Sequence, residues 1–122
     1  MDKSQAINTF WNSFGIPAYD EYTVPDGTSM PYITYNASFD AVNMDVPMTA
    51  SVWYRDSSWE NISKKVEQIS QTIGYSYYIR AIDGGYMVVK RGNVFAQRMN
   101  DPDDLDVRRI LISILIEFLT EN

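Results

Sequence analysis

The sequence predicts an α+β fold, in which a mostly antiparallel mixed sheet has two helices packed on it. Three observations support this class. Two segments place apolar residues at helical spacing, several short segments are rich in β-branched and aromatic residues, and the last segment alternates apolar residues over both faces. A length of 122 residues suits one domain, which we place over residues 1–122.

The first helix is predicted from a stripe of apolar side chains at helical spacing. Its members are Ile7, Phe10, Trp11 and Phe14. Asp2 or Ser4 can cap the start of this helix, because a short polar side chain accepts hydrogen bonds from the first free amides. Gly15 suits a C-terminal cap, and Pro17 prevents continuation.

Residues 16–30 form a predicted connector that contains a turn at 24–27. Pro25 fixes φ in this turn, and Gly27 tolerates the left-handed region. A strand rich in β-branched and aromatic residues is predicted over 31–39.

The segment 40–47 is acidic and weakly patterned, so we interpret it as a mobile hairpin loop. Its candidate mobile residues are Asp40, Met44 and Asp45. A further strand is predicted over 48–55. Because side chains alternate along a strand, either Trp53 or Tyr54 faces the core, but not both.

The second helix is predicted from a capping box, in which Ser57 caps the helix and Glu60 reaches back. A core-facing stripe follows at spacings of three and four residues. It consists of Trp59, Ile62, Val66, Ile69 and Ile73. Gly74 is the predicted end of the helix.

The remaining chain predicts more strands. A hairpin joins 77–82 to 86–90 through a type I′ turn at Asp83-Gly84, and after a turn at 91–93 a separate strand covers 94–99. In the last segment one face is predicted to carry Ile110, Ile112, Ile114, Ile116 and Phe118, and the other face Leu111, Ser113, Leu115, Glu117 and Leu119. Because both of its faces are apolar, we expect a central strand that is covered on both sides. The predicted order is α-β-β-α-β-β-β-β.

The composition excludes several classes of chemistry. The chain has no cysteine and no histidine, so it can hold no disulfide, no thiolate metal site and no Ser-His-Asp triad. No pair of residues suggests a nucleophile beside its base. We therefore expect no enzyme and no cofactor.

The beginning of the chain lacks the pattern of a signal peptide, since residues 1–14 hold no long apolar run before a small-residue cleavage site. No stretch of about 18 apolar residues exists. We expect a protein that is made in a cytoplasm, without a membrane anchor.

Charge is unevenly distributed within a net charge of −6. Residues 1–50 and 101–122 are acidic, whereas residues 51–100 carry seven bases against four acids. This balance disfavours general nucleic-acid binding. Opposite patches can instead meet head to tail between copies, although a mixed solvated surface explains the same pattern.

Two groups of residues are candidates for contacts between copies. The first is a basic patch, with a solvated strand edge as the competing interpretation. The second is a pair of tyrosines on the connector. The candidates are Arg80, Lys90, Arg91 and Arg98, together with Tyr19 and Tyr22.

An acidic loop precedes the last strand. Its carboxylates are Asp101, Asp103, Asp104 and Asp106. Oxygen ligands of this kind suit Mg²⁺ or Ca²⁺, but the spacing lacks the EF-hand pattern. We therefore favour an acidic turn and expect no metal.

Several phrases along the chain belong together. They are FWNSFGIPAYDEYTVPDG (10–27), PYITY (31–35), SVWYR (51–55) before SWENI (58–62), DGG (83–85), RGNVFAQRM (91–99) with Asp103 beyond it, and RRI (108–110) leading to EFLT (117–120). With these phrases the chain resembles the tail-terminator proteins of long-tailed bacteriophages and prophages. These proteins are also called tail completion or minor tail proteins, and the resemblance covers nearly the whole chain.

The resemblance implies a domain similar to the lambda-type terminator, which forms a hexameric ring. Such a ring caps the tail tube, stops its polymerisation and joins the tail to the head, while DNA passes through the lumen without specific binding. The implied partners are other copies of the chain, a tail tube protein and a head-neck connector protein, at the tail-head junction of the virion. We interpret the acidic loop as facing the lumen or a partner.

Three alternatives remain open from the sequence. A head-closure or neck protein is a close functional neighbour of a terminator. The acidic net charge also suits an inhibitor of a host nucleic-acid enzyme. A metal-dependent phosphoesterase is conceivable only if the aspartates of 101–106 bind a metal ion.

Overall fold

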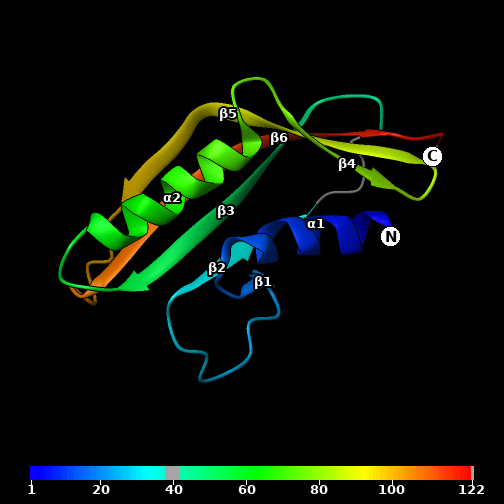
Figure 1. Cartoon of the computed structure of the whole chain (residues 1–122). Helices are drawn as coiled ribbons and strands as arrows, with labels where there is room; N and C mark the ends of the chain where they lie inside the picture. The colour runs from blue at the N-terminus through cyan, green and yellow to red at the C-terminus, as the bar shows by residue number, and fades with distance from the viewer. Residues whose placement is uncertain (38–41, 122) are drawn as a thin grey trace.

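The computed structural model describes residues 1–37 and 42–121 (Figure 1). Its elements are α1 (Lys3–Trp11), the 3₁₀ helix η1 (Asn12–Phe14), β1 (Ala18–Asp20), β2 (Tyr32–Tyr35), β3 (Val46–Arg55), α2 (Glu60–Ile73), β4 (Tyr78–Ile82), β5 (Gly85–Met99) and β6 (Val107–Leu119). Within the described residues, six strands form one sheet in the order β1-β2-β3-β6-β5-β4. Only the β1–β2 pair is parallel among them. The predicted α+β class, with a mixed and mostly antiparallel sheet, is confirmed.

Both helices pack on the same face of the sheet, which curls around them (Figure 1). Residues of α1 and α2 share one hydrophobic core with the isoleucine side of β6. Phe10 lies near its centre, where its ring makes edge contacts with Trp11 and Phe14 at centroid distances of 4.9 and 5.4 Å. The opposite face of the sheet carries neither helix.

The first helix begins and ends as predicted. Asp2 Oδ1 accepts a hydrogen bond from the Gln5 amide at 2.8 Å, and Gln5 Oε1 accepts one from the Asp2 amide at 3.0 Å. This reciprocal pair is a capping box. Gly15 terminates η1 in the left-handed region, with φ of 83°.

The second helix has the predicted stripe but a different start. Ser57 does not cap it, and the helix begins at Glu60 without a side-chain cap on its N-cap residue. Asp56 Oδ1 instead accepts from the Ser58 amide, and Ser58 Oγ accepts from the Glu60 amide at 3.0 Å. The predicted capping box is therefore wrong, because the Asp56 turn carries the chain two residues further, to Trp59 as the N-cap, before the helix begins. Ile62, Ile69 and Ile73 are buried as expected.

Two predicted strands are one continuous strand. β5 runs through the segment that was expected to turn at 91–93, and it pairs with β6 on both sides of a bulge between Arg91 and Ala96. Gly92 passes so close to β6 that an added Cβ would lie 2.8 Å from Ser113 O. The glycine therefore marks a close approach of two backbones and not a turn.

The turn between β4 and β5 also differs from the predicted type I′. That type needs positive φ at both central residues. Gly84 has φ of 78°, but Asn43 is the only non-glycine residue with positive φ in the described part of the chain, so Asp83 keeps a negative φ. The hairpin itself is confirmed.

The predicted connector contains the edge strand β1. Its residue Ala18 donates its amide to Asn12 Oδ1 at 3.0 Å and accepts from Asn12 Nδ2 at 3.2 Å, so a side chain occupies the place of a further strand. The next strand, β2, ends at Tyr35 and not near 39, while Phe39 and Asp40 lie outside the described residues. Val46 already belongs to β3, which shortens the predicted loop 40–47.

The last strand, β6, is central as predicted, but only one of its faces is covered by helices. Ile112, Ile114 and Phe118 on the helix side are almost completely buried, whereas Leu119 on the other side is 41% exposed. Leu111 and Leu115 are half-buried on that side. The expectation of cover on both faces is therefore wrong for the isolated chain.

Candidate interaction surfaces

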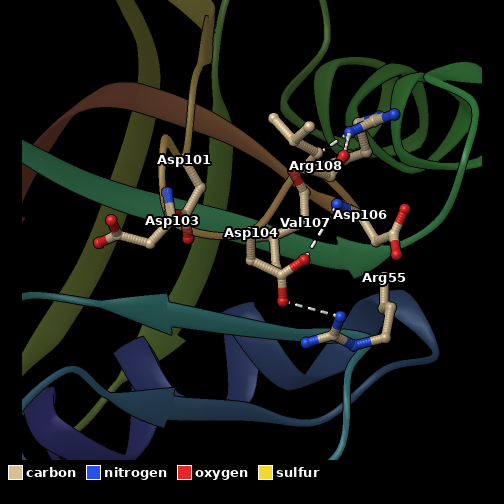
Figure 2. Close-up of polar contacts among 8 residues, drawn as sticks. Arg55, Asp101, Asp103, Asp104, Asp106, Val107 and Arg108 are labelled. Atoms are coloured by element: carbon tan, nitrogen blue, oxygen red, sulfur yellow. Dashed lines mark hydrogen bonds and ion pairs between the residues drawn. The ribbon is translucent and has the colours of Figure 1, made fainter.

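The acidic loop is held by its own carboxylates and by one arginine (Figure 2). Asp101 Oδ1 accepts from the Asp103 amide, and Asp104 Oδ1 accepts from the Asp106 amide, both at 3.0 Å. The other oxygen of Asp104 pairs with Arg55 Nη1 at 2.9 Å. Two turns and one ion pair therefore fix this loop to the end of β3.

The electrostatics of the loop favour ionised carboxylates. The hydrogen bond from the Asp106 amide, followed by the bond from Arg55, lowers the pKa of Asp104 below its usual value. The carboxylates do not converge, since Asp103 and Asp106 point in opposite directions in Figure 2. Within residues 1–37 and 42–121, no group of three or more carboxylates is arranged to hold a metal ion.

A cavity of about 330 Å³ lies beside this loop, at the N-terminal end of α2. It is lined by Trp59, Met99, Asn100, Asp101, Pro102, Leu105, Val107 and Arg108. Two guanidinium groups approach its aromatic wall, with Arg98 Cζ 4.7 Å and Arg108 Cζ 5.4 Å from the centre of the Trp59 ring. Both distances suit cation–π contacts. We call this site the Trp59 cavity.

Neither arginine at the Trp59 ring forms an ion pair in the described part of the chain, although Arg108 contributes to the lowered pKa of Asp56 after the hydrogen bonds from Ser58 and Asn61. Arg108 donates to the carbonyls of Leu105, Val107 and Ser57, while its Nε is buried without a hydrogen-bond partner. The lining of the cavity therefore combines an aromatic wall with one positive charge, Arg108, and one negative charge, Asp101, while Arg98 contacts the same ring without lining the cavity.

The predicted basic patch does not form one cluster. Lys90 lies opposite Leu115 and Arg91 opposite Ile114 on β6, so these two neighbours point to opposite faces of the sheet. Lys90 pairs with Asp45 Oδ1 at 3.1 Å, which joins the expected mobile loop to β5.

The three arginines of the predicted patch have separate neighbours as well. Arg91 donates to Ser70 O at 3.0 Å near the end of α2, whereas Arg98 lies on Trp59 near its beginning. Arg80 donates to the Tyr78 hydroxyl on β4. Of the predicted patch, only Arg98 contacts Trp59, and it does not line the cavity.

The predicted contact tyrosines differ in exposure. Tyr22 is 86% exposed, whereas Tyr19 is half-buried against Tyr32, with 6.2 Å between the ring centres. Met44 of the predicted mobile loop is 57% exposed.

One of the two adjacent aromatic residues of β3 faces the core, as predicted. Tyr54 packs against the core, and Trp53 points to the helix-free face, where its Nε1 donates to Thr34 Oγ1 at 2.9 Å. Arg109 lies over the Trp53 ring at 4.8 Å.

The helix-free face was missed from the sequence as an interaction surface. On β4, β5 and β6 it exposes Ile79 to 48%, Tyr86 to 50% and Leu119 to 41%. Strand register brings them together. Tyr86 of β5 pairs with Leu119 of β6, and Ile79 of β4 pairs with Val88, two residues after Tyr86 on β5. The leucines that alternate along β6 were the available signal.

No protein-family model matches the chain, and no curated protein matches its sequence. In the part of the chain that the structure describes, no helix has the length and hydrophobicity needed to cross a bilayer.

Proposed function

We propose that the protein is a structural subunit of a phage tail, which assembles into a ring, caps the tail tube and joins the tail to the head. The observation that carries the proposal is the helix-free face of the sheet. Ile79, Tyr86 and Leu119 on this face are each 41% or more exposed in the isolated chain. A sheet face that stays in water is normally polar, so apolar side chains at these positions favour a partner.

The composition of the surface supports an assembly role. Tyr, Trp and Arg are the residues that dominate the energetics of protein interfaces. They occur together on the same face around Trp53, where Tyr32 and Arg109 flank the indole ring. The helix-free face thus offers aromatic and aliphatic contacts from several strands.

The titratable groups support a structural role as well. Hydrogen bonds lower the pKa of Asp56, first from the Ser58 amide and then from Asn61, and burial raises the pKa of Tyr54. In the described residues these shifts, like that of Asp104, arise from turns and packing. None of them places a base beside a nucleophile, which covalent catalysis requires.

The acidic loop suits a surface past which DNA moves. Asp103 and Asp106 have no ion-pair partner in the described part of the chain. Like charge repels phosphate, so a lumen lined with such carboxylates lets DNA slide without sticking. We assign this loop to the lumen or to the surface that meets the next protein.

The proposal is tested by measuring the mass of the purified protein by light scattering over a concentration series, with and without tail tubes. We expect a ring, or a rise towards one, and retention of the protein on sedimenting tubes. Binding to a head connector without binding to tubes would instead favour a neck protein. A strict monomer that binds neither partner overturns the proposal.

A further inference from the structure

The sheet has two outer edges, and the chain itself occupies one of them. On β1, the amide and the carbonyl of Ala18 are bonded to the side chain of Asn12, at 3.0 and 3.2 Å. The carbonyl of Asp20 accepts from the Thr23 amide at 3.0 Å. Most of the backbone groups that could pair with a further strand are therefore already used at the β1 edge.

The opposite edge, formed by β4, is open. Ile82 and Gly85 face each other across a two-residue turn, so hydrogen bonds join them as the last pair of the β4–β5 hairpin. Backbone groups alternate in direction along a strand, so residues 78, 80 and 82 point their amides and carbonyls at β5, whereas residues 79 and 81 point theirs away from the sheet. Asp83 continues this alternation, because its amide points outward and donates to Met1 O at 2.8 Å.

The outward groups of β4 are free to pair with another strand. The Tyr77 carbonyl also points outward, because it lies in the same planar peptide unit as the Tyr78 amide, which points at β5. Within residues 1–37 and 42–121, this carbonyl and the outward amides and carbonyls of Ile79 and Ala81 form no hydrogen bond. Such an edge is a template for strand addition.

The side chains of this edge suit burial in a contact. Tyr77 is 55% and Ile79 48% exposed on the helix-free side, and Ala81 is exposed beside them. The intervening base, Arg80, points to the other side of the strand, where its Nε donates to the Tyr78 hydroxyl at 3.0 Å. From Tyr77 to Ala81, the helix-free side of the edge therefore lacks the charges that usually keep edge strands apart.

The edge is complementary to itself in one antiparallel register. With Ile79 on a two-fold axis, Ile79 exchanges hydrogen bonds with its own copy, and each Ala81 amide reaches the Tyr77 carbonyl of the second copy. The large Tyr77 side chain then lies opposite the small Ala81. On the other side of the strand, Arg80 lies opposite Tyr78 of the second copy, so a cation meets an aromatic ring.

The two neighbouring registers fit less well. An axis through Arg80 sets two like charges opposite each other, which is destabilising. It also brings a second strand to the Asp83 amide, which Met1 already occupies. An axis through Tyr78 leaves the Ala81 amide opposite residue 75, outside β4.

We propose that β4 pairs with β4 of a second copy in this antiparallel register, so that the two sheets become one continuous sheet. A two-fold contact of this kind closes on itself in a dimer, so it goes beyond the proposed ring and needs no tail tube. The paired segment of residues 77–81 is about 17 Å long. So small a contact should be weak and transient, which makes a covalent trap the suitable test.

The trap uses the absence of cysteine from the chain. Ile79→Cys places two thiols on the axis, where the Cα atoms of a hydrogen-bonded pair lie about 5.5 Å apart, within reach of a disulfide. Tyr86→Cys is the matched control, because Tyr86 is 50% exposed on the same face but belongs to β5. In the proposed dimer, three strand spacings keep the two control thiols about 14 Å apart.

We expect gentle oxidation of the full-length variants to give the 79–79 disulfide in about tenfold excess over the 86–86 disulfide, since a specific contact raises the local concentration of the thiols. A mixture of Tyr77→Cys and Ala81→Cys tests the register. Digestion and mass spectrometry should show the 77–81 disulfide in similar excess over the 77–77 disulfide, whose residues are about 14 Å apart in this register.

A proline should abolish the contact without disturbing the hairpin. Ala81→Pro removes an outward amide and leaves the bonds to β5 in place, as edge strands permit. Added to Ile79→Cys, it should lower the disulfide yield to that of the Tyr86→Cys control. Thermal denaturation checks that the double variant folds, and the mixture of residues 77 and 81 decides the question if it does not.

Equal yields at positions 79 and 86 overturn this inference, as does a 77–77 disulfide that matches the 77–81 disulfide. A folded proline variant that keeps the full yield overturns it as well. Failure of the proposed function is distinguishable. A trapped dimer without tube binding would keep the β4 contact and reject the tube cap, whereas tube binding without a trapped dimer would do the reverse.

Discussion

Arg55 and Asp104 join the end of β3 to the acidic loop, with Arg55 Nη1 2.9 Å from Asp104 Oδ2. The same carboxylate accepts from the Asp106 amide through its other oxygen. Both contacts favour the ionised form and lower the pKa of Asp104. The loop beside the Trp59 cavity is therefore shaped by a charged group, and its stability depends on pH.

Asp104→Asn should remove this dependence. Because the pKa of Asp104 is lower in the folded protein, its carboxylate stabilises the fold above its unfolded pKa of about 4. This stabilisation is lost as pH falls through the folded pKa. The Tm difference between wild type and variant should therefore be constant above about pH 5 and shrink below about pH 4. Asp26→Asn is the control, and a difference that persists at low pH would contradict the assignment.

Gly85→Ala should weaken the pairing of β5 with β6. An added Cβ would lie 1.9 Å from Leu119 O, so one of the two backbones must move. We expect a loss of about 3 kcal/mol or more in the free energy of unfolding, measured by urea denaturation. Gly27→Ala is the matched control, because nothing lies within 4 Å of its Cβ position and only its φ of 76° opposes the change. That control should lose about 1–2 kcal/mol, and equal losses would reject the clash.

Phe10→Ala should be strongly destabilising. Phe10 is 1% exposed and contacts aromatic rings from α1, η1 and β4, so its removal leaves a cavity between helix and sheet. The expected loss is about 3–5 kcal/mol. Tyr75→Ala, at a side chain that is 99% exposed, should change stability by less than about 0.5 kcal/mol. A small loss at Phe10 would mean that the helix does not pack as described.

Ile79→Lys and Tyr86→Lys should separate assembly from folding. Both side chains are about half exposed on the helix-free face, so charge is tolerated in the isolated chain. We expect a nearly unchanged Tm but loss of ring formation or of tube binding, measured by light scattering and co-sedimentation. Tyr75→Lys should leave assembly intact. Assembly that survives both face variants would place the interface elsewhere.

The sequence predicts the elements whose cause is local. The stripe around Phe10 and the stripe ending at Ile73 repeat at helical spacing, and both helices lie where these patterns place them. The alternation along β6 likewise identifies the central strand. Each of these patterns repeats over enough residues to predict, from the sequence alone, which side of the element faces the core.

The remaining features depend on residues far apart in the chain. The sequence around Gly92 suggests a turn. Glycine is needed there because Ser113 of β6 lies too close to leave room for a Cβ, and this contact is not visible in the local sequence. β1 has three residues, and the side chain of Asn12 completes its hydrogen bonds, so it shows no periodicity. α2 begins later than predicted because the side chain of Asp56 forms a turn with the Ser58 amide, which the sequence pattern did not indicate.

The candidate site was only partly predictable for the same reason. Arg98 was expected in a patch with its neighbours on β5, but the tertiary fold separates them and places it on Trp59. Arg108 comes from β6, and the cavity arises only when these elements meet. The acidic loop was identified from its composition, whereas its tie to Arg55 was not.

The central place of β6 also governs the timing of folding. β1, β2 and β3 form one ribbon, β4 and β5 form another, and β6 is the strand that joins them. A ribosome synthesises residues 107–119 after all the other strands, so each growing chain passes through a stage with two unjoined ribbons and open edges. Long-range pairing of this kind is slow and prone to aggregation. Holding chaperones should therefore bind released chains that are truncated before residue 107 far more than released chains that include residues 107–119.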